Sequence, residues 1–228
     1  KVGADVPEIR FPGFTDPWEQ RKLGEVASFE RGLTYSPDSI VDKNSGVRVL
    51  RSSNIVEDAL VLNDDEDVFV SPDAVKIPPA RTGDILITAA NGSSRLVGKR
   101  AKLHDLTGKT VHGGFMLLAR TSDPDFLNAS MGSSWYDRFL RYGVAGGNGA
   151  LGNLDRTALE KCHTYFPSSG EEQRLIGSFF REIDELITLH QREGAGGARG
   201  RANGQPSGPR QNRLNRLANP QELQCLRN

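Results

Sequence analysis

The strongest hydrophobic pattern in the chain lies over residues 171–193, where apolar side chains recur at alternating three- and four-residue spacing. This spacing places them on one face of an α-helix. The stripe consists of Ile176, Phe179, Ile183, Leu186 and His190, and Phe180 and Ile187 widen it on one side. Ser168 with Glu171, or Ser169 with Glu172, provides the capping box of a helix start. The pattern predicts an amphipathic helix over 168–193, whose apolar face packs either on its own domain or on a partner helix.

A different pattern, typical of β-strands, covers the first half of the chain. Short runs of apolar residues are separated there by Gly, Pro, Asn and Asp, the residues that favour turns. We therefore expect strands over 26–32, 47–50, 67–70, 84–90 and 113–120.

Two further helices are predicted outside these strands. Residues 16–19, Asp-Pro-Trp-Glu, place Asp, Pro and Glu at the preferred N-cap, first and third positions of a short helix, which we expect to end near Gly24. From residue 124 the apolar period becomes helical, and the buried face of that helix is expected to carry Leu127, Met131, Trp135 and Phe139. Together the patterns predict an α+β fold. It comprises a mixed, β-rich domain over 1–167, a long amphipathic helix of the coiled-coil type over 168–193 and a disordered tail over 194–228.

The composition changes abruptly after residue 193. Residues 194–228 carry six arginines and one acid, a net charge of +5, which leaves 23 basic and 28 acidic side chains in the first 193 residues, net −5. The tail has no apolar period and many glycines, which predicts disorder; it is interpreted as a linker-like or non-native segment, or as an RNA-binding tail. An acidic body is a poor free-standing nucleic-acid binder, because neutralisation of phosphates supplies most of the affinity. Any DNA binding must therefore rest on local basic clusters or on partner proteins.

No motif for catalysis, for a cofactor or for a metal is evident. The sequence GKT at 108–110 matches the end of a phosphate-binding loop, but the required glycine five positions before Gly108 is replaced by Leu103. The histidines and cysteines lack metal-ligand spacing. Two cysteines, Cys162 and Cys225, imply no disulfide framework and fit a reducing cytoplasm. No apolar run approaches the ~20 residues that span a bilayer, so we expect no membrane association.

Two polar and basic segments are the candidates for binding. One follows the strand predicted at 47–50, and the other follows the strand predicted at 84–90. Arginine and lysine contact phosphates or guanine edges, and asparagine can pair with adenine. The alternative is that these are ordinary solvated loop charges. The candidate DNA-binding residues are Arg48, Arg51, Asn54, Asn91, Ser93, Arg95, Lys99, Arg100 and Lys102.

Taken together, residues 7–193 resemble the specificity subunit of type I restriction–modification systems. The phrases that carry the resemblance are PEIRFPGFTDPWEQRKLGEVASFERG, TGDILITAANGSSRLVGKRA, GGFMLLAR, GNLDRTALEK and PSSGEEQRLIGSFFREIDELITLHQR. The resemblance implies a non-catalytic subunit in which a target-recognition domain reads one half of a bipartite site in double-stranded DNA. A long helix then acts as a spacer. It also implies that methyltransferase and restriction endonuclease subunits dock on the chain.

The chain departs from the family pattern in two ways. It holds one recognition domain where relatives hold two, and its helix pattern stops at residue 193. We therefore expect a half-subunit that forms a homodimer through 171–193, or else a fragment or silent cassette. The alternative function is a truncated interaction module that dimerises or binds the methyltransferase subunit through this helix without reading DNA.

Overall fold

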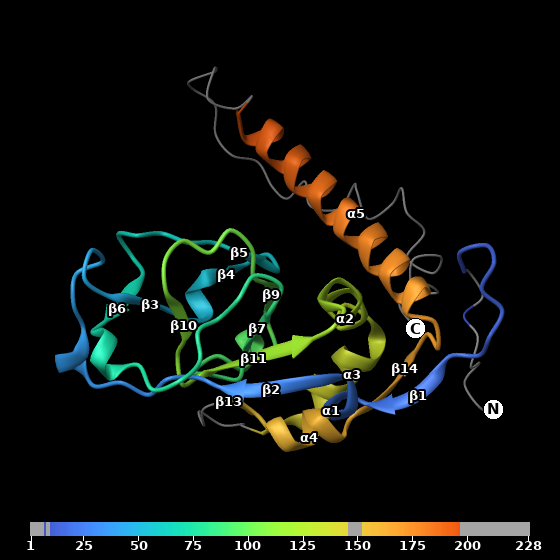
Figure 1. The fold of residues 1–228 in the computed structure, drawn as a ribbon, viewed down its shortest axis with the longest axis horizontal. Coiled ribbons are helices and arrows are strands. Elements are labelled where there is room, and N and C mark those ends of the chain that lie inside the picture. The colour runs from blue at the N-terminus through green and yellow to red at the C-terminus, as the bar shows by residue number, and fades with distance from the viewer. Residues whose placement is uncertain (1–6, 8–9, 146–151, 197–228) are drawn as a thin grey trace.

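The computed structural model describes residues 7, 10–145 and 152–196, and its strands are short (Figure 1). The strands are β1 Glu19–Lys22, β2 Ala27–Arg31, β3 Val47–Leu50, β4 Ile55–Val56, β5 Ala59–Leu60, β6 Val68–Val70, β7 Ile85–Thr88, β8 Ala90–Asn91, β9 Arg100–Lys102, β10 Thr110–His112, β11 Met116–Thr121, β12 Val144–Ala145, β13 Gly152–Leu154 and β14 His163–Phe166. The α-helices are α1 Leu23–Val26, α2 Pro124–Ser130, α3 Ser134–Gly143, α4 Arg156–Lys161 and α5 Gly170–Gly196.

The centre of the molecule is an antiparallel sheet with strand order β2-β11-β7-β9. Ile85, Leu86 and Ile87 are consecutive and fully buried, because both faces of β7 are covered. A second sheet, β10-β3-β6, lies at the end of the body away from α2 (Figure 1), and β10 in it runs parallel to β3. Four of the five predicted runs contain a strand, and the fifth, 113–120, overlaps β11 except for its last residue, so these predictions are confirmed.

The helix predicted at residues 16–24 is wrong. Residues 19–22 form strand β1, which pairs antiparallel with β14, and a single helical turn, α1, follows. Trp18 is 8% exposed and packs in the same core cluster as Phe126 and Phe166. Pairing with a strand more than 140 residues away, together with burial of the indole, outweighs the local capping signature.

The single helix predicted after residue 124 is two helices. Asp123 Oδ1 accepts from the Phe126 backbone N–H at the start of α2, and α2 ends at Ser130. Turn residues follow, and α3 begins at Ser134. Across the break, the Trp135 indole donates to Ser130 Oγ at 3.0 Å. Both helices contribute apolar side chains to one core cluster.

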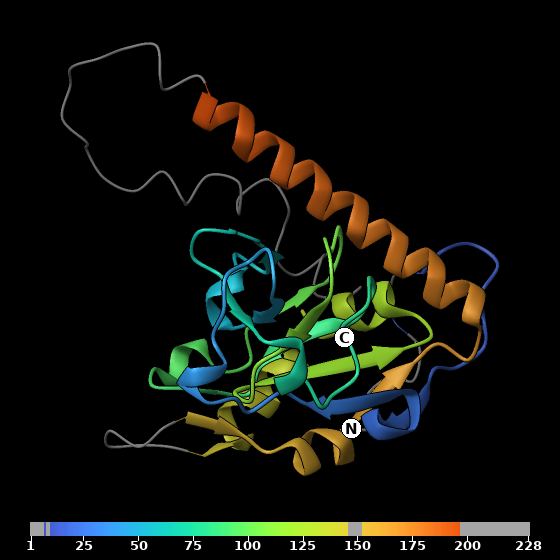
Figure 2. The ribbon, with the colours of Figure 1, turned by 60° about the vertical axis from the view of Figure 1, so that its left-hand side comes forward.

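Helix α5 starts on the body and then leaves it. Figures 1 and 2 both show it passing α2 and projecting beyond the domain. At 27 residues it is about 40 Å long. Gly177 makes the close approach to α2 possible, because a Cβ at this position would lie 2.6 Å from the Phe126 backbone nitrogen. The predicted helix is confirmed, and it ends three residues later than expected; the predicted tail lies outside the described residues from 197 onward.

The N-terminal segment is tied to the start of α5. Arg10 Nε and Nη2 donate to the two carboxylate oxygens of Glu172 at 2.7 and 2.6 Å, and the Glu172 side chain has no exposed surface. The Trp18 indole donates to the same carboxylate at 3.4 Å. The bidentate bond to Glu172 raises the pKa of Arg10 above its usual value. Of the two predicted capping boxes, the structure favours the one of Ser169 and Glu172, because Ser169 Oγ accepts from the Glu172 N–H at 3.4 Å.

Candidate nucleic-acid interface

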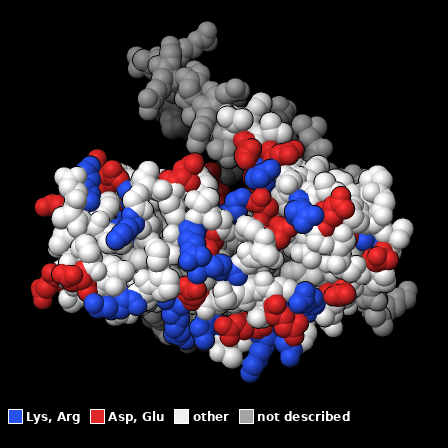
Figure 3. Space-filling view, in the orientation of Figure 1, with Lys and Arg blue, Asp and Glu red and all other residues white. Residues whose placement is uncertain are grey.

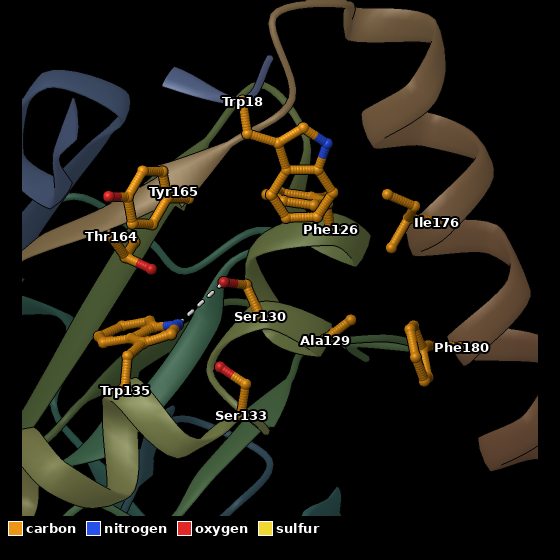
Figure 4. Close-up of a pocket in the computed structure, with 10 residues that line it drawn as sticks. All are labelled: Trp18, Phe126, Ala129, Ser130, Ser133, Trp135, Thr164, Tyr165, Ile176 and Phe180. Atoms are coloured by element: carbon orange, nitrogen blue, oxygen red, sulfur yellow. Dashed lines mark hydrogen bonds between the residues drawn. The ribbon is translucent and has the colours of Figure 1, made fainter. Parts of the chain in front are cut away.

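The two polar segments singled out from the sequence meet in one open groove of about 650 Å³. Thr88 Oγ1 donates to Ser52 Oγ at 3.3 Å and so links the end of β7 to the turn after β3. The groove is lined by Leu33, Thr34, Tyr35, Arg51, Ser52, Ser53, Ala90, Asn91, Gly113, Gly114, Phe115 and Met116. Its volume exceeds that of the hollow between α2, α3 and the base of α5 (Figure 4), which at about 10 Å³ holds at most one water.

Arg51 is held at the groove by its backbone. Its N–H donates to Asn54 Oδ1 at 2.8 Å, and its carbonyl accepts from the Asn54 N–H at 2.9 Å. Asn54 Nδ2 in turn donates to Asp67 Oδ1 at 2.6 Å. Asn54 is therefore buried and committed within the protein, and it acts by positioning Arg51.

Arg48 belongs to the same buried network and does not reach the groove. Its side chain is 4% exposed, with Nε 2.9 Å from Asp67 Oδ2 and Nη2 paired with Asp64. The guanidinium also lies over the Phe69 ring, 5.1 Å from its centroid. A side chain enclosed in this way is in place to stabilise β3 and β6 rather than to contact a ligand.

Asn91 and Ser93 form a turn at the second segment. Asn91 Oδ1 accepts from the Ser93 N–H at 3.0 Å, an Asx-turn that fixes the amide. Asn91 lines the groove and Ser93 does not. Arg95 is exposed beside them, and the described residues place no carboxylate within ion-pair distance of it.

The three remaining basic candidates are engaged with the protein. Lys99 Nζ donates to the Ile55 carbonyl at 3.4 Å, and Arg100 donates to the Asn128 carbonyl at 3.2 Å. Lys102 pairs with Asp125 of α2. These contacts hold β9 and the residues before it against the neighbouring segments, and none of the three lines the groove.

Sequence reasoning missed the aromatic part of the groove. Phe115 is 65% exposed, and Tyr35 lies on the same lining. The signal available for Phe115 was the preceding glycine pair, Gly113 and Gly114, which lets the chain turn sharply before β11.

The electrostatics of the groove rest on one side chain. Among the described residues that line it, Arg51 is the charged one. His112, which precedes the lining residue Gly113, adds no charge at pH 7, because burial lowers its pKa below the usual value. Its Nε2 donates to the Glu30 carbonyl at 3.1 Å. On the face drawn in Figure 3, basic and acidic side chains are interspersed. The charge is therefore local, and the body does not present a uniform basic surface there.

Within the described residues, no group of three or more His, Cys, Asp or Glu is placed to hold a metal ion. None of the helices in this part of the chain is both long and apolar enough to cross a membrane.

Comparison with known proteins identifies the fold. A chain of a type I R-M system, from a structure concerned with complex assembly and conformational transition, matches with a TM-score of 0.56 and 18% identity, covering 81% of this chain and 43% of that one. The type I restriction–modification system S subunit from M. genitalium matches with a TM-score of 0.51 and 15% identity, covering 82% and 44%. The HsdS subunit from Thermoanaerobacter tengcongensis matches with a TM-score of 0.54 and 17% identity, covering 80% and 41%.

The chain thus has the fold of type I S subunits, as the sequence resemblance predicted, and it spans less than half the length of these structures. No family model and no curated protein sequence matches it.

Proposed function

We propose that this chain is a non-catalytic DNA-recognition unit of a type I specificity subunit, which reads one half of a bipartite site. The observation that carries the proposal is the groove, where Arg51 and Asn91 come together from distant parts of the chain. Arginine and asparagine are among the side chains that make paired hydrogen bonds to base edges in the major groove. The S-subunit fold supports the same assignment.

The charge distribution supports a role within a complex. The first 193 residues are acidic overall, and the lining of the groove contributes one positive charge. Because non-specific affinity for DNA comes from neutralised phosphates, a chain of this kind depends on other subunits to supply it. Methyltransferase subunits, and the endonuclease subunit that joins them, are the partners we propose.

The proposal predicts that the chain selects a defined DNA motif. Purified chain, alone and mixed with a type I methyltransferase subunit, is incubated with a random 30-base-pair duplex library, and bound DNA is sequenced over several rounds. We expect one short motif to be enriched, more strongly in the mixture, and we expect Arg51→Ala to weaken the enrichment. Absence of any motif in both arms would overturn DNA reading and favour the interaction-module alternative.

We also propose that the outer part of α5 pairs with a second helix and acts as the spacer. In the structure, some residues of the predicted stripe are buried and others are exposed. Ile176 and Phe180 are buried in the domain core, whereas Leu186 and Ile187 are 65% and 51% exposed. Phe179 lies between these groups, with its ring edge-on to Phe11. Among the described apolar side chains of the stripe, Leu186 and Ile187 are therefore the ones most available to a partner.

The helix proposal predicts a dimer in solution. We expect light scattering of the purified chain to give twice the monomer mass, since an exposed apolar stripe on a long helix is stabilised by pairing. The double variant Leu186→Asp, Ile187→Asp should be a monomer. Arg174→Asp changes the net charge by the same two units at an exposed position outside the stripe and should remain a dimer. A monomeric parent chain would contradict homodimerisation.

A further inference from the structure

We infer that the groove is specific for a guanine, read through N7 and O6 in the major groove, with Arg51 as the specificity-determining residue. The inference deepens the proposed function and rests on it. It comes from the hydrogen-bonding capacity that the groove has left once its internal bonds are counted.

Four backbone carbonyls of the groove accept hydrogen bonds within the protein. The carbonyls of Arg51 and Ser52 accept from Asn54 and Ile55 in the turn after β3. The Gly113 carbonyl accepts from the Met116 N–H at 2.8 Å. The Phe115 carbonyl accepts two bonds, from the N–H groups of Ala89 and Ala90, at 2.9 and 3.0 Å. No carboxylate is present among the lining residues. The lining therefore offers a ligand no charged acceptor, and the acceptors that remain are neutral carbonyl, amide and hydroxyl oxygens.

The donors, in contrast, are available. Arg51 Nη2 makes one long bond to the Glu66 carbonyl, 3.4 Å, and within the described part of the chain its Nε and Nη1 have no partner. Asn91 also has donors available. Because a backbone N–H can only donate, the Asn91 atom next to Ser93 N must be the oxygen, and within the described residues both Nδ2 hydrogens are left without a partner. Arg51 and Asn91 together present an excess of donors.

Guanine is the base that matches such a groove. Its major-groove edge carries two adjacent acceptors, N7 and O6, which suit the fork of a guanidinium. Adenine and cytosine each present an amino donor that requires an acceptor, and thymine offers a single acceptor beside a methyl group. Phe115, which lines the same groove as Arg51 and is exposed in the free chain, would exclude water from such a pair once DNA covers the groove.

The test removes one acceptor from DNA at a time. Once a motif has been selected as above, duplexes are made in which each guanine of the motif is replaced by 7-deazaguanine, which lacks N7 but keeps base pairing. Affinity is then measured by fluorescence anisotropy. We expect one guanine at which the replacement weakens binding by about tenfold, the effect of losing a good base contact. In Arg51→Ala the same replacement should have no further effect.

Arg95→Ala is the matched control, because Arg95 is exposed beside the groove without lining it. This variant should retain the tenfold sensitivity to 7-deazaguanine, whatever it loses in overall affinity through phosphate contacts. Arg51 is exposed, so Arg51→Ala should unfold at the temperature of the parent chain, which separates loss of contact from loss of fold.

The outcomes separate the two proposals. A motif without guanine, or one in which no 7-deazaguanine matters, overturns the guanine inference and leaves DNA reading intact. Sensitivity that persists in Arg51→Ala overturns the role of Arg51. Failure to select any motif instead overturns the proposed function itself.

Discussion

Arg10→Ala should lower the free energy of unfolding by about 3 kcal/mol, the lower end of the range for removing one partner of a buried ion pair. The Glu172 carboxylate has no exposed surface, and both of its oxygens accept bonds from Arg10. Without the guanidinium this charge stays buried at the start of α5, with the Trp18 indole as its remaining side-chain partner among the described residues. Urea denaturation followed by circular dichroism measures the loss.

Two further variants show whether the loss arises from the buried charge. Glu172→Gln in the Arg10→Ala background removes the unpaired carboxylate and should recover part of the stability. Arg21→Ala removes an exposed partner, 3.9 Å from Glu25, and should cost less than about 1 kcal/mol. Equal losses for Arg10→Ala and Arg21→Ala would show that the Arg10–Glu172 pair does not hold α5 to the domain.

Gly32→Ala should also cost about 3 kcal/mol, at the upper end for overpacking. A Cβ on Gly32 would lie 2.0 Å from the carbonyl oxygen of Gly113, and a backbone atom cannot move aside as a flexible side chain can. The adjacent bridge between Leu33 and Gly113 brings the Phe115 turn to the groove, so the change should disrupt binding as well as stability. Thermal unfolding and DNA affinity both report on it.

Gly92→Ala is the control for this prediction. A Cβ on Gly92 would meet no atom within 4 Å, so alanine should leave the unfolding temperature unchanged. A Gly32→Ala protein as stable as Gly92→Ala would mean that the approach of residues 32 and 113 is looser than the structure shows.

Much of the fold was predictable because it depends on near neighbours in sequence. The run Ile85–Thr88 is apolar and bounded by turn residues, and it forms a buried strand. Helix α5 follows directly from the spacing of its apolar residues and from Ser169 at its start. In both cases burial of a periodic face and the local capping bond favour the same structure.

The failures occurred where distant residues compete with local preference. Residues 16–19 satisfy the rules for a helix start. Residues 19–22 nevertheless pair with β14 as a strand, and Trp18 is buried in the core. The candidate basic residues divide for the same reason. Lys102 and Arg51 are both basic residues in polar segments, and the sequence does not distinguish them. In the structure Lys102 pairs with Asp125 of α2, whereas no acid pairs with Arg51 among the described residues.

The sequence by itself determined the α+β class, the positions of the main strands, the amphipathic helix and the two polar segments that follow β3 and β7. These features depend on period, caps and turn residues within a few positions of one another. Only the tertiary structure decided that the segments share a groove with Phe115, that Arg48 and Asn54 are buried supports, and that Ile176 and Phe180 belong to the domain core. The physical reason is that the freedom of a polar or apolar side chain depends on the partners that folding brings to it, and those partners lie far away in the chain.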